Sequence, residues 1–369
     1  MTRIFLGEAT QRGVDTRRVS LKSNKQGEDS MKQVTLGKTG ITVNRLGFGG
    51  IPIQRVSEEQ AVDAVLHALE KGMDFIDTSR MYTTSEARIG KALSQTSKKP
   101  AIATKSFGRT ADAIRNDVEI SLRELRRDVI DIYQCHSINN IEEYRKITAK
   151  DGAYDGLMKA REEGLILHTG ITSHSLDILE RALDDDLFET IMVCFSFLEP
   201  AAKEKVIPKA LAKNVGILVM KPLSGGVIEA AEPALKWALG HPETLVLAGV
   251  ENRDLIDQNW SVFQGSWELT KSDQETIDAI SLQYDKKFCR RCDYCLPCPS
   301  EIPIQYVLGA RTLLKRMGIG ALKVNIFSTL WDKAEKCREC GQCVTRCPYG
   351  LPIPELIKAN VEWRKGLDA

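Results

Sequence analysis

Short apolar runs alternate with amphipathic stretches along most of this chain, from about residue 41 to 263. A strand that is buried on both faces gives a brief apolar run, whereas a helix with one buried face gives apolar residues three and four positions apart. Ser57–Lys71, Asp112–Arg127 and Ser175–Leu183 have the helical spacing, and Ser57 with Gln60 predicts a capping box. The apolar runs that predict strands are Val43–Ile51, Met73–Asp77, Pro100–Lys105, Val129–His136, Leu165–Thr172, Thr190–Phe197, Gly216–Leu223 and Thr244–Val250.

Strict alternation of strand and helix indicates an α/β protein, and eight repeats of it predict a (β/α)8 barrel, the TIM barrel. An open, doubly wound sheet is the alternative. Its usual dinucleotide signature is absent, because Gly47-Phe48-Gly49-Gly50-Ile51-Pro52 has proline where the third glycine should be.

Residues 1–30 are polar, and we expect a flexible N-terminal extension there. Thr16–Lys22 resembles a twin-arginine export signal, but polar residues follow it where such a signal needs an apolar segment. We therefore interpret that match as a coincidence. The sequence predicts a barrel domain over residues 31–285.

Residues 286–369 form a second predicted domain, which is rich in cysteine. Apolar residues recur at helical spacing over Pro303–Met317, and a second helix is expected from near Pro354 towards Trp363. This pattern favours a small, helix-rich ferredoxin-like domain.

Composition changes this outline little. Lysine plus arginine total 51 and aspartate plus glutamate total 50, so no strong field for nucleic acid or a membrane surface is implied. No apolar stretch approaches the ~20 residues of a membrane-spanning helix. We expect a cytoplasmic protein with no nucleic-acid or membrane partner. Its oligomeric state cannot be predicted from the sequence.

Eight of the ten cysteines fall in two runs near the C-terminus. The second run reads C-x2-C-x2-C-x3-C-P, a spacing that is typical of a loop around a [4Fe–4S] cluster whose fourth thiolate binds a neighbouring cluster. The first run has one residue fewer before its last cysteine and also ends in Cys-Pro. The sequence Cys-Pro-x-x-(Ile/Leu)-Pro-Ile ends each run, so the two are an internal repeat. The candidate ligands are Cys289, Cys292, Cys295, Cys298, Cys337, Cys340, Cys343 and Cys347.

Zinc and disulfides are the alternatives for these cysteines. Zinc ligands usually come as two pairs separated by a longer gap, and disulfides need an oxidising compartment. The spacing favours two [4Fe–4S] clusters. If each fourth cysteine crosses over, one cluster is bound by the first three cysteines with Cys347, and the other by the second three with Cys298. The shortened gap leaves that partition open. Cys135 and Cys194 lie in apolar strands and are expected in the core.

Polar residues follow three consecutive predicted strands at their C-terminal ends, where the active site of a (β/α)8 barrel is found. Asp77 ends the second strand with Tyr82 in the loop after it, Lys105 ends the third, and His136 ends the fourth. A buried lysine makes a tyrosine a better acid, an aspartate orients the lysine, and a histidine polarises a carbonyl oxygen. Each residue alone also has a purely structural interpretation. Together they suit carbonyl reduction, for which a cofactor must supply the hydride.

Several segments resemble the aldo-keto reductase family. They are Leu36–Ile41, Leu46–Gly49, Gly72–Tyr82 with Ser85–Glu86 and Ile89–Leu93, Asp131–His136, Gly170–His174 and Lys221–Gly226. The resemblance runs from about residue 32 to 285. With the cysteine-rich tail, the chain resembles the subgroup of that family fused to a ferredoxin-like domain. It implies a catalytic tetrad of Asp77, Tyr82, Lys105 and His136, with Tyr82 as the general acid in reduction.

The resemblance also implies positions for a nicotinamide cofactor. Thr172 and Ser173 stand where the family has Ser-Asn at the carboxamide, and Met192 replaces a glutamine of that site. Met220 falls where many relatives stack an aromatic ring, and Lys221 could reach the pyrophosphate. The adenosine end favours NAD, because Glu251 would repel a 2′-phosphate, while Arg253 leaves NADP open. The full set is Thr172, Ser173, Met192, Met220, Lys221, Pro222, Leu223, Gly249, Glu251, Asn252 and Asn259.

Three functions remain open at this point. One is a nicotinamide-dependent oxidoreductase that reduces an aldehyde or ketone, or oxidises the alcohol, with structural or regulatory clusters. In the second, a redox partner protein supplies electrons that the clusters pass to the barrel. The third is an electron carrier or redox sensor on a retained barrel. The substrate itself is not readable.

Overall fold

The computed structural model describes residues 32–241, 243–317 and 329–367. The expected N-terminal extension over residues 1–30 lies outside them. Eight parallel strands form a closed barrel, in which the last strand pairs with the first. This closure confirms the predicted TIM barrel over the open sheet. The barrel strands are β3 (Leu46–Gly49), β4 (Phe75–Asp77), β5 (Ala101–Ser106), β6 (Ile130–Cys135), β7 (Ile166–Ser173), β8 (Thr190–Cys194), β9 (Gly216–Met220) and β10 (Leu245–Gly249).

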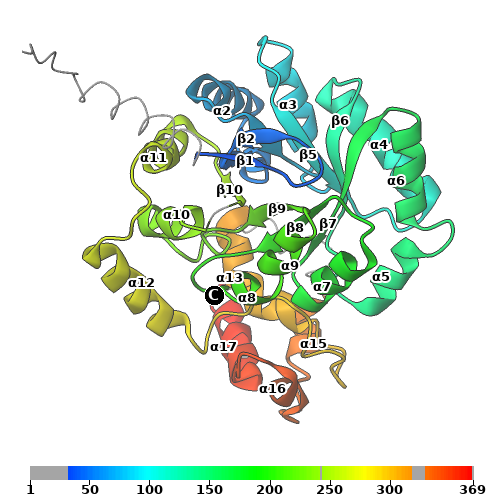
Figure 1. Cartoon of the computed structure of the whole chain (residues 1–369). Helices are drawn as coiled ribbons and strands as arrows, with labels where there is room; N and C mark the ends of the chain where they lie inside the picture. Colours follow the sequence, from blue (N-terminus) through cyan, green and yellow to red (C-terminus); the bar gives the residue numbers. More distant parts are fainter. Residues whose placement is uncertain (1–31, 242, 318–328, 368–369) are drawn as a thin grey trace, which may run out of the picture.

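Helices surround the barrel, and the main apolar core lies between them and the strands (Figure 1). The predicted capping box is confirmed: Gln60 N donates to Ser57 Oγ and Ser57 N to Gln60 Oε1, both at 3.1 Å. A 3-10 helix, η1 (Pro52–Arg55), follows β3. The helices are α2 (Glu58–Lys71), α3 (Ser85–Leu93), α4 (Ala111–Leu125), α5 (Ile141–Thr148), α6 (Ala153–Glu162), α7 (Leu176–Asp185), α8 (Ala202–Lys205), α9 (Ile207–Ala212), α10 (Ala231–Leu239), α11 (Arg253–Gln264) and α12 (Lys271–Tyr284).

The first apolar run, Val43–Ile51, is predicted as one strand, and this prediction is wrong. The structure divides it between β2 (Thr42–Asn44) and β3, and β2 pairs antiparallel with β1 (Gln33–Thr35) in a separate hairpin. Asn44 and Arg45 cause the break, because their side chains bind backbone carbonyls of other segments. The apolar side of the hairpin then packs against residues inside the barrel.

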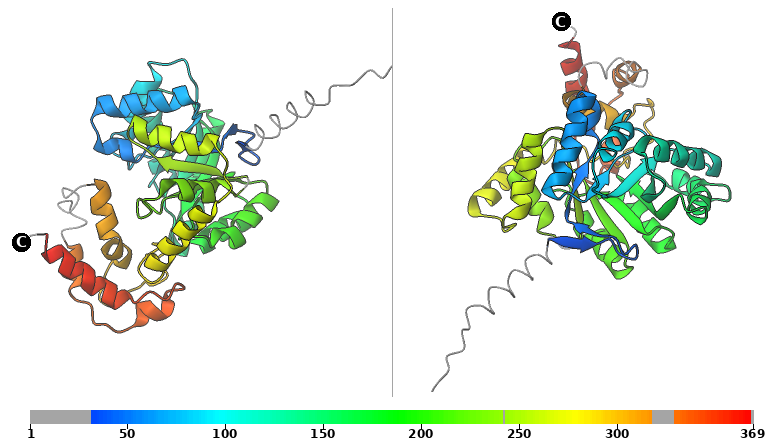
Figure 2. Two further views of the ribbon diagram at one scale, coloured as in Figure 1. Left: turned by 90° about the vertical axis from the view of Figure 1, so that its left-hand side faces the viewer. Right: turned by 90° about the horizontal axis from the view of Figure 1, so that it is seen from above.

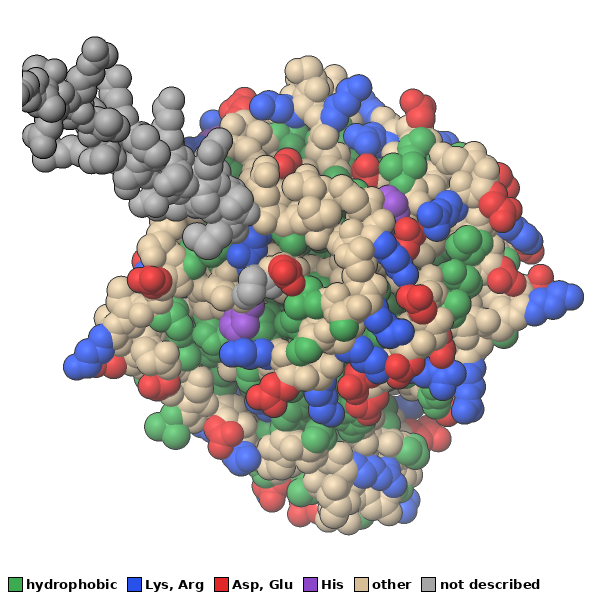
Figure 3. Space-filling view, viewed as in Figure 1, with side chains coloured by type: hydrophobic (Ala, Val, Ile, Leu, Met, Phe, Trp, Pro, Cys, Tyr) green, Lys and Arg blue, Asp and Glu red, His purple; other side chains and the backbone are tan. Residues whose placement is uncertain are grey.

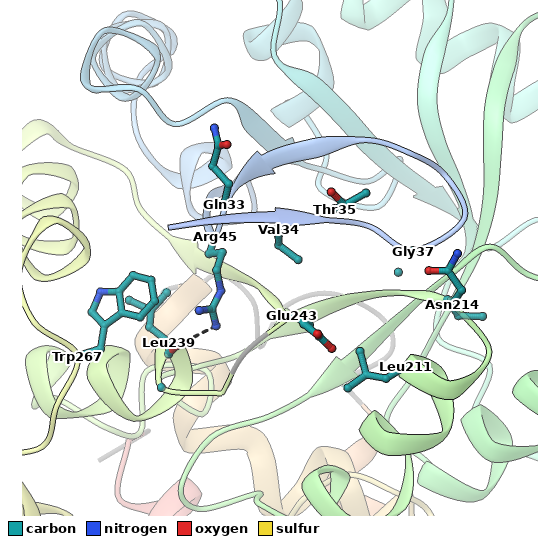
Figure 4. A pocket seen from close by; sticks show the side chains of 13 residues that line it. Gln33, Val34, Thr35, Gly37, Arg45, Leu211, Asn214, Leu239, Glu243 and Trp267 are labelled. Atoms are coloured by element: carbon teal, nitrogen blue, oxygen red, sulfur yellow. Dashed lines mark hydrogen bonds between the residues drawn. The ribbon is translucent and has the colours of Figure 1, made fainter. Parts of the chain in front are cut away.

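A cavity of about 700 Å³ lies beside this hairpin (Figure 4). Arg45 crosses it, and its guanidinium donates to the carbonyls of Leu239 at 2.8 Å and Thr244 at 3.3 Å while lying over the Trp267 ring. Carbonyls at a helix C-terminus have no partner within the helix, so Arg45 satisfies the end of α10. This large cavity is therefore part of the scaffold at the end of the barrel away from the strand C-termini. Basic and acidic side chains are interspersed over this face (Figure 3).

The tail lies at the opposite end of the barrel from the hairpin (Figure 2). Its described helices are α13 (Ile304–Met317), α15 (Leu330–Ala334), α16 (Gln342–Arg346) and α17 (Ile353–Lys365), which confirms the two helices predicted there. A small apolar core of its own includes Val307 and Ile357. A further apolar cluster, with Phe197 from the barrel and Phe288 from the tail, joins the two. Among the described residues, no helix has both the length and the apolar character needed to span a membrane.

Candidate functional site

Lys105 and Asp77 form a buried ion pair at the C-terminal end of the barrel strands. Lys105 Nζ donates to both Asp77 carboxylate oxygens, at 2.6 and 2.8 Å, and to the Thr78 carbonyl at 2.6 Å. Strand register explains the pairing. Asp77 lies opposite Ala103, and Lys105, two residues on, points to the same side of β5. Lys105 is only 1% exposed, so both charges depend on this contact.

Tyr82 lies over this pair. Lys105 Nζ is 5.1 Å from the centroid of the Tyr82 ring. Burial alone would lower the pKa of Lys105, but the charge of Asp77, with a hydrogen bond to Tyr82, holds that pKa above its usual value. The ammonium therefore stays charged beneath the phenol. A charged donor at this place favours the phenolate form of Tyr82.

His136 completes the group from the next strand. Its ring lies 6.1 Å from that of Tyr82, edge to face, and its Nδ1 is 3.0 Å from Ser79 Oγ. Burial, followed by the charges of Lys105 and other cations, sets the pKa of His136 well below its usual value. The imidazole is therefore neutral at physiological pH and suited to polarise a carbonyl oxygen. The structure thus brings together all four predicted catalytic residues.

A cavity of about 240 Å³ opens above Asp77 and Tyr82. Its walls come from the ends of β3, β8, β9 and β10 and from the loops that follow β3 and β9. They include six of the predicted cofactor residues, namely Met192, Met220, Lys221, Pro222, Leu223 and Gly249.

The other predicted cofactor residues do not line this cavity. Thr172 Oγ1 accepts a hydrogen bond from Ser137 N at 2.7 Å, and Ser173 Oγ bonds Asn139 and Ser175. Asn252 caps α11 through Leu255 N at 3.0 Å, and Asn259 is buried in the same helix.

Two ion pairs lie at the predicted adenosine end. Glu251 pairs with Arg55, which lines the cavity from η1. Arg253 Nε donates to Asp63 at 2.8 Å. Both charged residues that bear on the choice between NAD and NADP therefore already have a partner of opposite charge.

The cysteines line two small cavities in the tail, four in each. The inner cavity, on the barrel side, is lined by Cys289, Cys292, Cys295 and Cys347, and the outer cavity by Cys298, Cys337, Cys340 and Cys343. In each, the fourth cysteine comes from the other run, as the crossover partition requires. Among the described residues, no group of three or more His, Cys, Asp or Glu side chains is placed to hold a single metal ion.

The two cysteine loops share a backbone conformation. Arg291 and Asp293 have φ of 60° and 62°, and Glu339 and Gly341, at the same positions of the second loop, have 49° and 73°. Burial raises the pKa of Cys292 and Cys295 to about 12, so these thiols need a positive metal centre to become thiolates. Four thiols at each of two cavities fit a pair of [4Fe–4S] clusters, because each such cluster is held by four cysteine thiolates.

Three further residues of the site were missed at the sequence level. Ser79 bonds the His136 ring, Arg109 donates to the His136 carbonyl at 2.9 Å, and Arg55 lines the cavity. Ser79 lies between Asp77 and Tyr82 in the sequence, so its place near the site could have been predicted from the sequence. For the two arginines, only the folded structure reveals their positions.

Comparison with known proteins agrees with this geometry. The model of the aldo/keto reductase family matches residues 45–233. The chain belongs to the aldo/keto reductase family. It is 30% identical over 227 residues to L-galactose dehydrogenase of Arabidopsis thaliana, a match that covers 56% of this chain and 70% of that protein. An aldo-keto reductase of Mycobacterium sp. (strain MCS) is 26% identical over 266 residues, which are 65% of this chain and 88% of the relative.

Solved structures share the barrel of this aldo/keto reductase. The holo form of a Bacillus halodurans aldo-keto reductase has a TM-score of 0.59 at 23% identity, covering 68% of this chain and 96% of that one. A Klebsiella pneumoniae aldo-keto reductase in complex with NADPH has a TM-score of 0.57 at 19% identity, covering 68% and 94%. The tail matches the model of a 4Fe-4S dicluster domain over residues 288–352. The protein is therefore an oxidoreductase of this family fused to a dicluster domain.

Proposed function

We propose that the protein reduces an aldehyde or ketone, or oxidises the corresponding alcohol, by hydride transfer with a nicotinamide cofactor. One observation carries this proposal: Asp77 and Tyr82 line the cavity, the charged Lys105 lies beneath the Tyr82 ring, and neutral His136 lies beside that ring. Tyr82 would donate the proton to the carbonyl oxygen in reduction and accept it in oxidation. The cofactor supplies or takes the hydride.

The cavity residues suit such a cofactor. Met192 and Met220 give it apolar walls, and Lys221 offers a positive charge for the pyrophosphate. We propose NAD as the preferred cofactor, because Glu251 with Arg55 and Arg253 with Asp63 leave no net positive charge for a 2′-phosphate at this end. The ratio of kcat/KM for NADH and NADPH tests this preference. A ratio in favour of NADPH would overturn it.

Tyr82→Phe tests the proposed chemistry. Loss of the proton donor should lower kcat with a generic aldehyde about 10²–10⁴-fold while leaving the Kd of the nucleotide nearly unchanged. Tyr284→Phe, in α12 outside the cavity, is the matched control and should keep full activity. Turnover that persists in Tyr82→Phe would contradict the assignment of Tyr82.

We further propose that residues 286–369 carry two [4Fe–4S] clusters, with the inner one bound by Cys289, Cys292, Cys295 and Cys347. About eight iron atoms and eight sulfides per chain are expected after anaerobic preparation. Zinc in place of iron would overturn this part. The end of α12 at Tyr284 supports the proposed boundary near residue 285.

A second function is electron transfer between the clusters and the barrel. The inner cavity favours it, because its loop contacts the catalytic end of the barrel: Arg290 donates to the Leu198 carbonyl at 3.0 Å, and the hydroxyls of Ser175 and Tyr294 are 3.4 Å apart. EPR spectra under anaerobic conditions, after NADH or NADPH and then after dithionite, separate the two functions. Signals of reduced clusters after nucleotide alone would support electron exchange between the clusters and the barrel. Signals that appear only after dithionite would support a reductase whose clusters take no part in hydride transfer.

A further inference from the structure

Arg291 lies between the first two cysteines of the inner loop and lines the inner cavity. Its side chain is 15% exposed, and its Nε and Nη2 make no hydrogen bond with any described residue. The neighbouring Arg290 differs. It donates to the carbonyls of Leu198 and Phe288 and lies over the ring of Tyr349. Arg291 also lies over the Phe288 ring, at 5.7 Å, but it makes no hydrogen bond through Nε or Nη2.

Glu199 faces Arg291 from the barrel. Its carboxylate follows β8 at the catalytic end and is 7% exposed. Arg291 Nη2 lies 3.6 Å from Glu199 Oε2, which is too far for a hydrogen bond, and that oxygen has no donor among the described residues. A buried polar group without a hydrogen bond reduces the free energy of unfolding by about 1–3 kcal/mol. The ion pair of Arg291 and Glu199, which lacks a hydrogen bond, therefore needs an explanation.

The outer loop provides a natural comparison. Glu339 occupies the position that Arg291 has in the inner loop, with the same left-handed backbone. Its side chain is exposed and carries the opposite charge. The two loops therefore repeat in backbone and differ in the charge beside the cavity. Iron–sulfur potentials depend on such charges and on hydrogen bonds to the sulfur atoms.

We propose that Arg291 sets the reduction potential of the cluster in the inner cavity, with Glu199 of the barrel acting against it. This inference rests on the proposed pair of clusters. One-electron reduction adds a negative charge to the cluster, with an external reductant such as dithionite supplying the electron. The guanidinium stabilises that charge, and the N–H groups of Nε and Nη2 can donate to sulfur. The Glu199 carboxylate disfavours the same charge, so the barrel contributes to the potential of a centre in the tail.

Redox titration of the full-length holoprotein, followed by EPR, tests the proposal. Arg291→Gln should lower the midpoint potential of one cluster, and Glu199→Gln should raise the potential of the same cluster. Each change is expected to alter the reduction equilibrium about tenfold, which is 59 mV for one electron. Arg291→Lys, which keeps the charge, should stay near the wild-type potential. The potential of the second cluster should not move in any of these variants.

Arg290→Gln is the matched control, because it removes a positive charge that lines the same cavity but whose N–H groups already donate to carbonyls. It should lower the potential by less than Arg291→Gln, because it removes a charge but no donor that is available to sulfur. Iron and sulfide are measured first in every variant. A wild-type protein without clusters would refute the proposed function. Fully loaded Arg291→Gln and Glu199→Gln proteins with unchanged potentials would refute the role of Arg291 alone.

Discussion

The catalytic site of the barrel and the cysteine loops of the tail both contain buried polar groups, but they satisfy them differently. In the barrel, Lys105 Nζ donates three hydrogen bonds, each to a protein oxygen within 2.8 Å. In the tail, thiols line cavities, and Arg291 keeps two nitrogen atoms without partners among the described residues. The Lys105 ammonium is thus satisfied by protein oxygens alone, whereas the thiols of the tail need a metal centre as their common partner. Preorganisation and metal-dependent assembly occur in one chain.

Removal of iron should therefore separate the two regions. Without clusters, four thiols in each cavity lose their common partner, and metal binding is a large part of the folding free energy of such small domains. We expect the tail to unfold on chelation while the barrel keeps its structure. Hydrogen exchange of α17 compared with α2 measures this difference. Equal protection of α17 before and after chelation would show that the apolar core of the tail is sufficient by itself.

Asp77→Ala tests the barrel site, where the protein itself supplies the partners of the buried charge. Removing one partner of a buried ion pair leaves the Lys105 ammonium uncompensated, which costs about 3–5 kcal/mol of unfolding free energy. Activity should also be lost, since Lys105 is then no longer held charged beneath Tyr82. Chemical denaturation of the barrel transition gives the stability change. The double variant Lys105→Met with Asp77→Ala, which removes both charges, should recover part of the lost stability but none of the activity.

Two buried histidines of the barrel should make its stability depend on pH. Burial and nearby cations lower the pKa of both His136 and His174 well below the usual value, so the folded protein keeps them neutral. The unfolded chain binds more protons than the folded protein once the pH falls below about 6.5. Stability should therefore fall as the pH decreases below that value. Thermal unfolding of His136→Gln between pH 5 and 7 should show a shallower slope than wild type, and an unchanged slope would contradict this assignment.

Much of this architecture could be predicted from the sequence, and the exceptions have physical causes. The barrel and the convergence of Asp77, Tyr82, Lys105 and His136 could be predicted, because hydrophobic period and the residues at strand ends are local features of the sequence. Thr172 and Ser173 are predicted at the carboxamide of the cofactor, yet they do not line the cavity, and their hydroxyls already bond Ser137, Asn139 and Ser175, which no local pattern shows. The contact of Arg291 with Glu199 joins segments that are distant in sequence. Such contacts depend on how the tail meets the barrel.

The cysteine repeat also offers a small test of backbone strain. Glu301 and Gly350 both stand three residues after the last cysteine of their runs, and both have a left-handed backbone, with φ of 53° and 59°. This conformation costs a residue with a Cβ atom about 1–2 kcal/mol, whereas glycine loses about 0.5–1 kcal/mol through unfolded-state entropy instead. Glu301→Gly should thus stabilise the tail of the holoprotein by less than about 1 kcal/mol, seen as a higher transition temperature.

The charge of Glu301 must be separated from its backbone. Its carboxylate is 3.5 Å from Lys333 Nζ, and the side chains are 82% and 42% exposed, so this ion pair contributes little. Glu301→Gln removes the charge but keeps the Cβ atom, and it should leave the transition temperature almost unchanged. Gly350→Ala places a Cβ atom at the equivalent position and should lower that temperature. If Glu301→Gly behaves like Glu301→Gln, the left-handed backbone at Glu301 carries no net strain, and the predicted gain in stability is wrong.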